Sequence, residues 1–275
     1  MKTAMRFVIL LLLFCPILGC TKSEIPDQHT LTVALSAAPA TLDPRRTTDA
    51  TGQRITSLIF NSLVRTGPDL RLAGDAADSW TYKDLKYTFN LKPGLTFSNG
   101  RRLTKEDVLY TFEEYKKAGG SFTSTLEPVK SVEVTESPDG ALTIILNLSK
   151  FHAPLLDDLS AIKLLPKTEI VADSEAFARA PIGTGSYVLK KQDAQSIALE
   201  ARENHPILAP RIKNLIFKVI QDDSTRHLKV LKGGIDIAQQ ELPLNKIAEF
   251  EKNSEFRVVK FPGLSMNYIL VNFKN

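Results

Sequence analysis

The sequence is poor in cysteine and has no long apolar segment. Its 275 residues contain two cysteines, Cys15 and Cys20, so the chain beyond them can form no disulfide. The apolar run from Phe7 to Phe14 is too short to cross a bilayer as a helix. A chain of this length without disulfides must rely on a large core, which its 43% hydrophobic residues can supply.

Excess charge of one sign is also missing. The formal net charge is +4, from 35 basic and 31 acidic residues. The basic pairs Arg45-Arg46, Arg101-Arg102 and Lys190-Lys191 are scattered and have no aromatic residues between them. We therefore expect solvated surface at these pairs and no nucleic-acid partner.

Motifs for covalent catalysis are absent as well. No G-x-S-x-G pattern occurs, and Ser186 in Gly183-Thr184-Gly185-Ser186 lacks the nucleophile-elbow spacing. Without a nucleophile, a base and an orienting group in a known pattern, we predict that the protein is not an enzyme. An exported hydrolase using Ser186 or another hydroxyl is the alternative, and labelling with an activated ester would reveal it.

Metal and phosphate motifs are equally lacking, so we expect no metal site and no cofactor. The four histidines have no H-E-x-x-H or close ligand spacing, and a surface or hydrogen-bonded role is expected for them: His29, His152, His205 and His227. Gly183-x-Gly185 is not followed by the Lys-Ser/Thr pair that a phosphate loop needs.

The clearest structural signal lies between Leu95 and Glu114. Asn99-Gly100 is a tight-turn dipeptide, and Thr104 precedes Asp107 by the three residues of a capping box. Val108, Phe112 and Tyr115 then follow at helical spacing, and Gly119-Gly120 is expected to end the helix. The stretch predicts a strand, a turn and a capped helix, which is scaffold rather than a catalytic site.

The remaining pattern mixes strands and helices without a repeat, so an α+β or mixed α/β fold is expected. Alternation predicts strands at 31–35, 87–91, 196–201, 215–220, 235–237, 256–261 and 268–273, and a hairpin of 129–134 with 141–148. Helical spacing predicts helices within 49–63 and over 224–231 and 245–252.

The N-terminus has the pattern of an export signal. Lys2 and Arg6 precede the apolar run, and Ile17-Leu18-Gly19-Cys20 resembles a bacterial lipobox. We predict a lipoprotein signal peptide at 1–19 and lipidation of Cys20. An ordinary secretory signal with a chance cysteine is the alternative.

The order of motifs along the chain resembles bacterial extracellular solute-binding proteins of family 5, the peptide, oligopeptide and nickel receptors of ABC importers. The motifs that carry the resemblance are Leu42-Asp43-Pro44, Ala77-Asp78-Ser79-Trp80, Tyr87 to Leu91, Phe97 to Gly100, Leu103 to Val108, Gly183 to Tyr187 and Gly234-Ile235-Asp236. Each motif is weak by itself, but their shared order covers nearly the whole chain after the signal.

The resemblance implies a periplasmic-binding-protein-like fold of type II, cluster C. Lobe I would comprise 20–60 and 167–275, and lobe II would be the insertion 61–166. In the family a third lobe begins after a strand similar to Tyr268–Asn272, so an N-terminal portion lacking lobe III is expected.

The resemblance also implies ligand contacts on the lobe I side of a cleft. The loop after Asp43-Pro44 would offer backbone groups to an extended ligand, Phe122 would lie at the pocket edge, and an amide at Gln240 would suit a peptide bond. The candidate ligand-binding residues are Thr48, Ala50, Phe122, Gln240, Met266 and Tyr268. For each, a place in the core or in solvent is the alternative.

The expected function is a substrate-binding lipoprotein for peptides or similar small solutes. Its partners would be the ligand, an ABC transporter permease and the membrane through the lipid at Cys20. We expect a monomer on the cell envelope, at the periplasmic face in Gram-negatives or the outer face of the cell membrane in Gram-positives. A chain without lobe III is then expected not to bind an oligopeptide with micromolar affinity by itself. The alternative is a shortened lipoprotein acting as a scaffold or docking module without transport.

Overall fold

The computed structural model describes residues 29–239 and 242–260 and contains a five-stranded and a four-stranded sheet. The five-stranded sheet has the order β11-β1-β10-β9-β8, in which β1 runs parallel to β10 and β11 and the other pairs are antiparallel. Its strands are β1 (Thr30–Leu35), β8 (Tyr187–Gln192), β9 (Ser196–Ala201), β10 (Asn214–Val219) and β11 (Ile237–Ala238).

The four-stranded sheet is antiparallel with the order β4-β5-β7-β6. Its strands are β4 (Ala77–Lys83), β5 (Lys86–Leu91), β6 (Val129–Glu136) and β7 (Leu142–Leu148). The alternate leucines and isoleucines of β7 are buried, and the opposite face is polar, with the Thr143 hydroxyl donating to Asn90 Oδ1 at 3.1 Å. This alternation is why the hairpin could be predicted from the sequence. A small pair, β2 (Val64–Thr66) and β3 (Leu72–Gly74), completes the strands.

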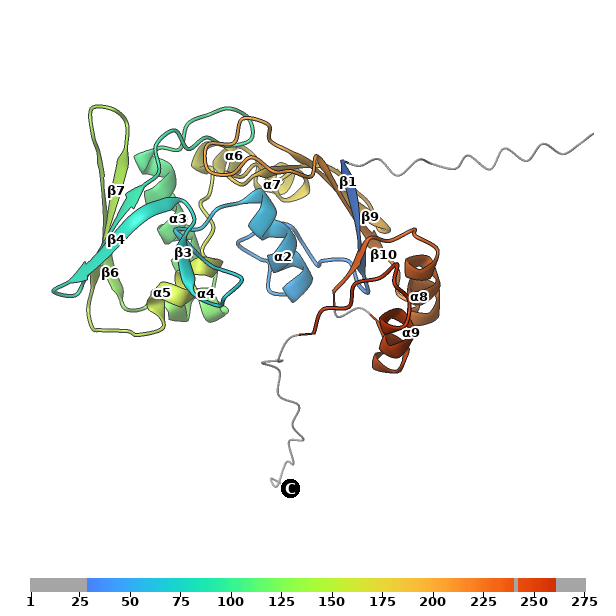
Figure 1. Ribbon diagram of the computed structural model, residues 1–275. Helices are drawn as coiled ribbons and strands as arrows, with labels where there is room; N and C mark the ends of the chain where they lie inside the picture. The colour runs from blue at the N-terminus through green and yellow to red at the C-terminus, as the bar shows by residue number, and fades with distance from the viewer. Residues whose placement is uncertain (1–28, 240–241, 261–275) are drawn as a thin grey trace, which may run out of the picture.

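The helices lie between and around the sheets, with α2 in the middle of the molecule (Figure 1). They are α2 (Ala50–Ile59), α3 (Lys105–Lys117), α4 (Gly120–Leu126), α5 (Leu155–Asp158), α6 (Lys167–Ala172), α7 (Ser174–Arg179), α8 (Asp223–Leu231) and α9 (Ile247–Glu251). Two 3₁₀ helices are η1 (Leu159–Ala161) and η2 (Leu244–Lys246). Within the described ranges, none of the helices has both the length and the apolar character needed to cross a membrane.

Several predicted boundaries need correction. The helix expected within 49–63 is present as α2 and ends at Ile59. Beyond it, the Asn61 N–H donates to Thr184 Oγ1 and the Ser62 N–H donates to Asp75 Oδ2. Helix α8 begins one residue before Ser224, since the Asp222 carboxylate caps it by accepting from the Thr225 N–H at 2.7 Å. The strand expected at 235–237 lies instead at Ile237–Ala238, and residues 256–260 form no strand. The strand expected at 268–273 lies outside the described residues.

Helix α3 has the predicted capping box. The Asp107 N–H donates to Thr104 Oγ1, and Asp107 Oδ2 accepts from the Thr104 N–H at 3.0 Å. Arg101 pairs with this carboxylate at 2.7 Å and with Glu169 on α6 at 2.8 Å. Because charged groups that are partly buried need partners, this network fixes α6 against the start of α3.

The turn at Gly183–Gly185 joins three segments of the chain. The Gly185 N–H donates to the Ile59 carbonyl at 2.7 Å, and the Ser98 N–H donates to the Gly183 carbonyl at 2.9 Å. A Cβ on Gly183 would stand 2.1 Å from the Ile59 carbonyl oxygen. Glycine is therefore required by close backbone approach at this position rather than by a phosphate.

Gly183→Ala should lower the free energy of unfolding by about 1–3 kcal/mol, because the new methyl enters space that backbone already fills. Urea denaturation would measure the change. Gly234→Ala is the matched control: its Cβ would meet the Lys229 carbonyl at 3.4 Å, an ordinary contact, and should change stability by less than about 0.5 kcal/mol. Equal losses in the two variants would refute the close-approach argument.

Candidate ligand-binding site

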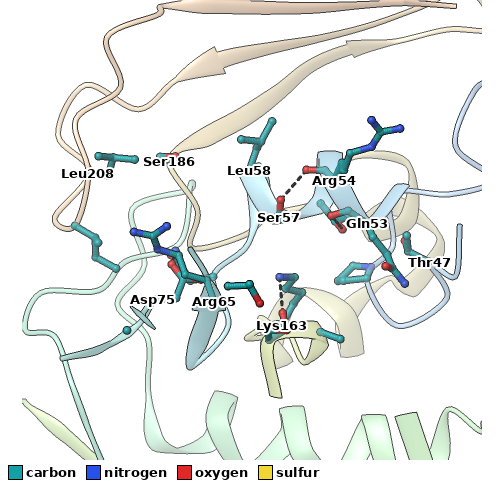
Figure 2. A pocket seen from close by; sticks show the side chains of 18 of the residues that line it. Thr47, Gln53, Arg54, Ser57, Leu58, Arg65, Asp75, Lys163, Ser186 and Leu208 are labelled. Carbon is teal, nitrogen blue, oxygen red and sulfur yellow. Dashed lines mark hydrogen bonds between the residues drawn. The ribbon is translucent and has the colours of Figure 1, made fainter. Parts of the chain in front are cut away.

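A cavity of about 770 Å³ lies beneath α2. Its wall combines the α2 face with segments around β2, β3 and η1 and with the loops beside β8 and β9. The lining residues include Thr47, Ala50, Gln53, Arg54, Ser57, Asn61, Arg65, Asp75, Lys92, Phe122, Ser160, Lys163, Ser186, His205 and Leu208 (Figure 2). A concave site of this volume, assembled from several segments, has the dimensions of a small-molecule pocket.

The amphipathic pattern of α2 sets the upper wall. Ile55, Thr56 and Ile59 are buried among the core, so Gln53 and Ser57 on the other face remain exposed at the cavity. The Asp49 carboxylate begins the helix by accepting from the Gly52 N–H at 2.7 Å. The helix therefore presents polar side chains to a ligand.

Lys163 lies on the opposite wall. Its Nζ donates to Ser62 Oγ at 2.8 Å and to the Ser160 carbonyl at 2.9 Å. The Ser62 hydroxyl donates to the same carbonyl at 2.6 Å. Burial lowers the pKa of Lys163 to about 8, with Asp75 opposing the shift, because an ammonium is less stable where water is excluded.

Helix α3 holds the backbone of the Lys163 segment. The N–H groups of Lys163, Leu165 and Lys167 donate respectively to side-chain oxygens of Tyr115, Thr111 and Asp107, at 3.2, 2.9 and 2.9 Å. The spacing matches because four helical residues rise about 6 Å and two extended residues about 6.6 Å. Burial raises the pKa of Tyr115, which keeps this phenol neutral.

Asp75 has both carboxylate oxygens occupied within the protein. Oδ1 accepts from Asn61 Nδ2 and Oδ2 from the Ser62 N–H, each at 2.8 Å. Lys92 Nζ donates to the Asp75 carbonyl at 2.8 Å. Asn61 Oδ1 is buried and has no hydrogen-bond partner among the described residues. The carboxylate thus orders the cavity wall.

His205 is a satisfied structural residue. The Leu208 N–H donates to Nδ1 at 3.1 Å, so Nδ1 is an acceptor and Nε2 donates to the Thr184 carbonyl at 2.8 Å. Burial lowers the pKa of this imidazole, which favours the neutral form that the two contacts require. Across the described residues, no group of three or more His, Cys, Asp or Glu side chains could hold a metal ion.

The structure places the predicted site residues unevenly. Ala50 and Phe122 line the cavity, and the Phe122 ring also packs edge-on against Tyr115 at 5.0 Å. Thr48 is exposed but does not line the cavity, whereas its buried neighbour Thr47 does. The other candidates, Gln240, Met266 and Tyr268, and the lipidation residue Cys20 lie outside the described residues.

Sequence reasoning missed Asn61, Asp75 and Lys163. Lys163 did carry a signal, because it is the one basic residue in an otherwise apolar stretch from Ala161 to Pro166. A lone lysine there must either reach solvent or find buried acceptors. Asn61 and Asp75 had no comparable signal.

The fold is the mixed α/β fold of periplasmic binding proteins. The match covers about half the length of solved cluster C structures. The oligopeptide-binding protein AppA of Bacillus subtilis, solved with a nonapeptide, superposes with a TM-score of 0.72 and 26% identity, covering 81% of this chain and 46% of that one. NikZ of Campylobacter jejuni, solved with Ni(L-His), gives a TM-score of 0.71 and 26% identity, covering 82% and 46%.

The chain belongs to the bacterial extracellular solute-binding proteins, family 5, whose model matches residues 71–275. This is a family of solute-binding proteins and not of enzymes. The "Probable D,D-dipeptide-binding periplasmic protein DdpA" of Escherichia coli is 29% identical over 257 residues, 88% of this chain and 49% of that protein. AppA of Bacillus subtilis is 27% identical over 260 residues, 89% and 46%. The chain spans about half the length of these curated relatives.

Lys163→Met should stabilise the protein at pH 7 and lose that advantage as the pH rises to about 10.5. The folded pKa of about 8 is below the ordinary value of 10.5, so the buried charge opposes folding below pH 8 and this penalty fades between the two values. The full penalty is about 3 kcal/mol, and lost hydrogen bonds reduce the expected gain to about 1–3 kcal/mol.

Urea denaturation of both proteins at pH 7 and pH 10 would measure this difference. Lys130→Met, at an exposed position on β6, should show no such pH dependence. A Lys163→Met effect that is the same at both pH values would contradict the buried-charge interpretation.

Proposed function

We propose that this chain contributes to solute capture for an ABC importer of peptides or similar small solutes. The observation that carries the proposal is a cavity lined by α2, β2, η1 and the β8 and β9 loops in a chain of the family 5 solute-binding proteins. Peptide relatives support the ligand class: AppA of Bacillus subtilis is named for oligopeptides and was solved with a nonapeptide.

We further propose that 20–60 with 167–275 form lobe I and that 61–166 form lobe II. The five-stranded sheet supports this division because it takes β1 from one end of the chain and β8 to β11 from the other. All strands of the four-stranded sheet come from between Ala77 and Leu148. The cavity then lies where the two proposed lobes meet.

The proposed ligand contacts start with Ala50 and Phe122, which line the cavity. Ala50 is the first residue of α2 and leaves room for a ligand, and Phe122 supplies an apolar surface. Thr48, Gln240, Met266 and Tyr268 remain proposed contacts that rest on the sequence resemblance. An extended peptide would use backbone groups and shallow side-chain pockets of this kind.

The polypeptide of residues 21–275 should bind a nonapeptide at this cavity with a Kd weaker than about 10 µM. Tight sites bury most of the ligand surface, and an extended nonapeptide, about 30 Å long, is only partly enclosed by a cavity of about 770 Å³. Amide chemical-shift changes in a nitrogen-15 NMR titration should concentrate at Ala50, Gln53 and Phe122, and calorimetry would give the affinity. AppA of Bacillus subtilis serves as the positive control.

Ala50→Trp should remove the binding by filling the cavity, whereas Ala172→Trp, at an exposed helical position away from it, should retain binding. Scattered or absent shifts at 5 mM peptide would reject this site. A Kd tighter than about 10 µM would reject the argument from partial enclosure of the ligand.

We also propose that the protein is anchored by a lipid at Cys20. Cys20→Ala should abolish incorporation of radiolabelled palmitate and move the protein from the membrane fraction to the soluble exported fraction. Cys15→Ala, within the proposed signal peptide, should leave both unchanged. Retained labelling in Cys20→Ala would show that another residue carries the lipid or that there is no lipobox.

A further inference from the structure

The cavity wall carries a surplus of positive charge. Arg54, Arg65, Lys92 and Lys163 line it, and Asp75 is the one acidic lining residue in the described ranges. Both Asp75 oxygens are already occupied by Asn61 Nδ2 and the Ser62 N–H, as described above. Cationic side chains of the wall are therefore available to a ligand, whereas the Asp75 carboxylate is occupied by hydrogen bonds within the protein.

Lys163 retains bonding capacity toward the cavity. An ammonium has three N–H donors. Two of them reach the Ser62 hydroxyl and the Ser160 carbonyl, both in the wall. Figure 2 shows the Lys163 side chain rising from the segment after η1 toward Ser57 on α2, so its tip faces the space between the two walls. The third donor is available to a ligand there.

Arg65 adds a second cation on the same side. It belongs to β2 and is exposed, and no residue within 29–239 or 242–260 forms an ion pair or hydrogen bond with its guanidinium. In Figure 2 it stands to the left of Lys163. Lys92, in contrast, is engaged with the Asp75 carbonyl. Arg54 donates to Gln239 Oε1 at 3.3 Å and to the Ala50 carbonyl at 3.4 Å. Donors not used within the described residues thus remain at Lys163 and Arg65.

We propose that this cavity binds the carboxylate end of its ligand, with the Lys163 ammonium as the direct contact and Arg65 as a second positive charge. The proposal rests on the proposed function and narrows its ligand class to solutes with a free carboxylate. Ser62 is a positioning residue, because its hydroxyl and the Ser160 carbonyl fix the ammonium. A ligand carboxylate would accept from the third N–H of the ammonium.

The partly buried position of Lys163 is also favourable to such a contact. Hydrogen bonds between ionised groups are about twice as strong as neutral ones, and exclusion of water strengthens them. A bound carboxylate would stabilise the ammonium that burial disfavours. Binding and protonation of Lys163 should therefore be coupled, and that coupling gives the proposal a direct measurement.

The test uses the polypeptide of residues 21–275 labelled with carbon-13 at the lysine Cε. Lys163 is assigned from the signal lost in Lys163→Arg, and its pKa is read from pH titrations without ligand, with 10 mM trialanine and with 10 mM trialanine amide. Trialanine should raise the pKa of Lys163 by at least about 0.5, and the amide should leave it unchanged. Lys130, outside the cavity, should respond to neither peptide.

A second measurement compares affinities for the two peptides. Wild type should bind trialanine about fivefold more tightly than its amide, which is the preference expected from a partly exposed charge contact. Lys163→Met should reduce this affinity ratio to about one. Arg65→Ala should reduce it partly. Lys130→Met should keep the wild-type ratio. If Lys163→Met does not fold, the pH titration of Lys163 in the wild type still tests the carboxylate contact.

The outcomes separate the two proposals. Backbone shifts at the cavity with both peptides, but no change in the Lys163 pKa, would overturn the carboxylate contact and leave solute binding standing. Absence of any backbone shift with either peptide would overturn both. An equal response to 10 mM inorganic phosphate would show a general anion site and overturn the carboxylate assignment.

Discussion

The contact on which the cavity depends is the match between one face of α3 and the extended segment 163–167. Tyr115, Thr111 and Asp107 are spaced four residues apart on the helix, and they accept from N–H groups two residues apart on the segment. Buried N–H groups that lost these acceptors would cost about 1–3 kcal/mol each. These three hydrogen bonds therefore fix the backbone from which the Lys163 side chain extends, so α3 determines the position of its ammonium.

The Gly183–Gly185 turn imposes a second constraint, on the opposite side. A backbone hydrogen bond from the Gly185 N–H to the Ile59 carbonyl holds the end of α2 beside the start of β8. The Thr184 hydroxyl also accepts from the Asn61 N–H at 3.1 Å. Asn61 in turn orients Asp75. A polar wall at the junction of two sheets is costly unless each group is satisfied. Asn61 Oδ1 has no such partner among the described residues, and burial lowers the pKa of Lys163; perturbed groups of this kind are common at functional sites.

Sequence patterns predicted the elements whose signals are local. The capping box of α3 and the alternation of β7 are properties of neighbouring residues, and both are present. Helix α2 lies within the predicted range. It stops before Leu63, whose spacing continues the helical pattern, because tertiary hydrogen bonds of Asn61 and Ser62 end the helix earlier. Of the cavity, the sequence indicated Ala50 and Phe122 only through a family resemblance. The sequence could not place Asp75 and Lys163 in one site, since 88 positions separate two residues that line the same cavity only after folding.

Helix α3 thus has two roles that its sequence alone does not distinguish. Its capping box satisfies N–H groups at the helix start, and its apolar face is buried. Yet Tyr115, which belongs to the predicted apolar face, and Thr111 are acceptors that hold the Lys163 segment. The Asp107 carboxylate likewise has three roles: it caps α3, forms the ion pair with Arg101 and accepts from the Lys167 N–H. A helix recognised as scaffold is therefore also what aligns the cavity wall, because scaffold and site share one set of buried polar groups.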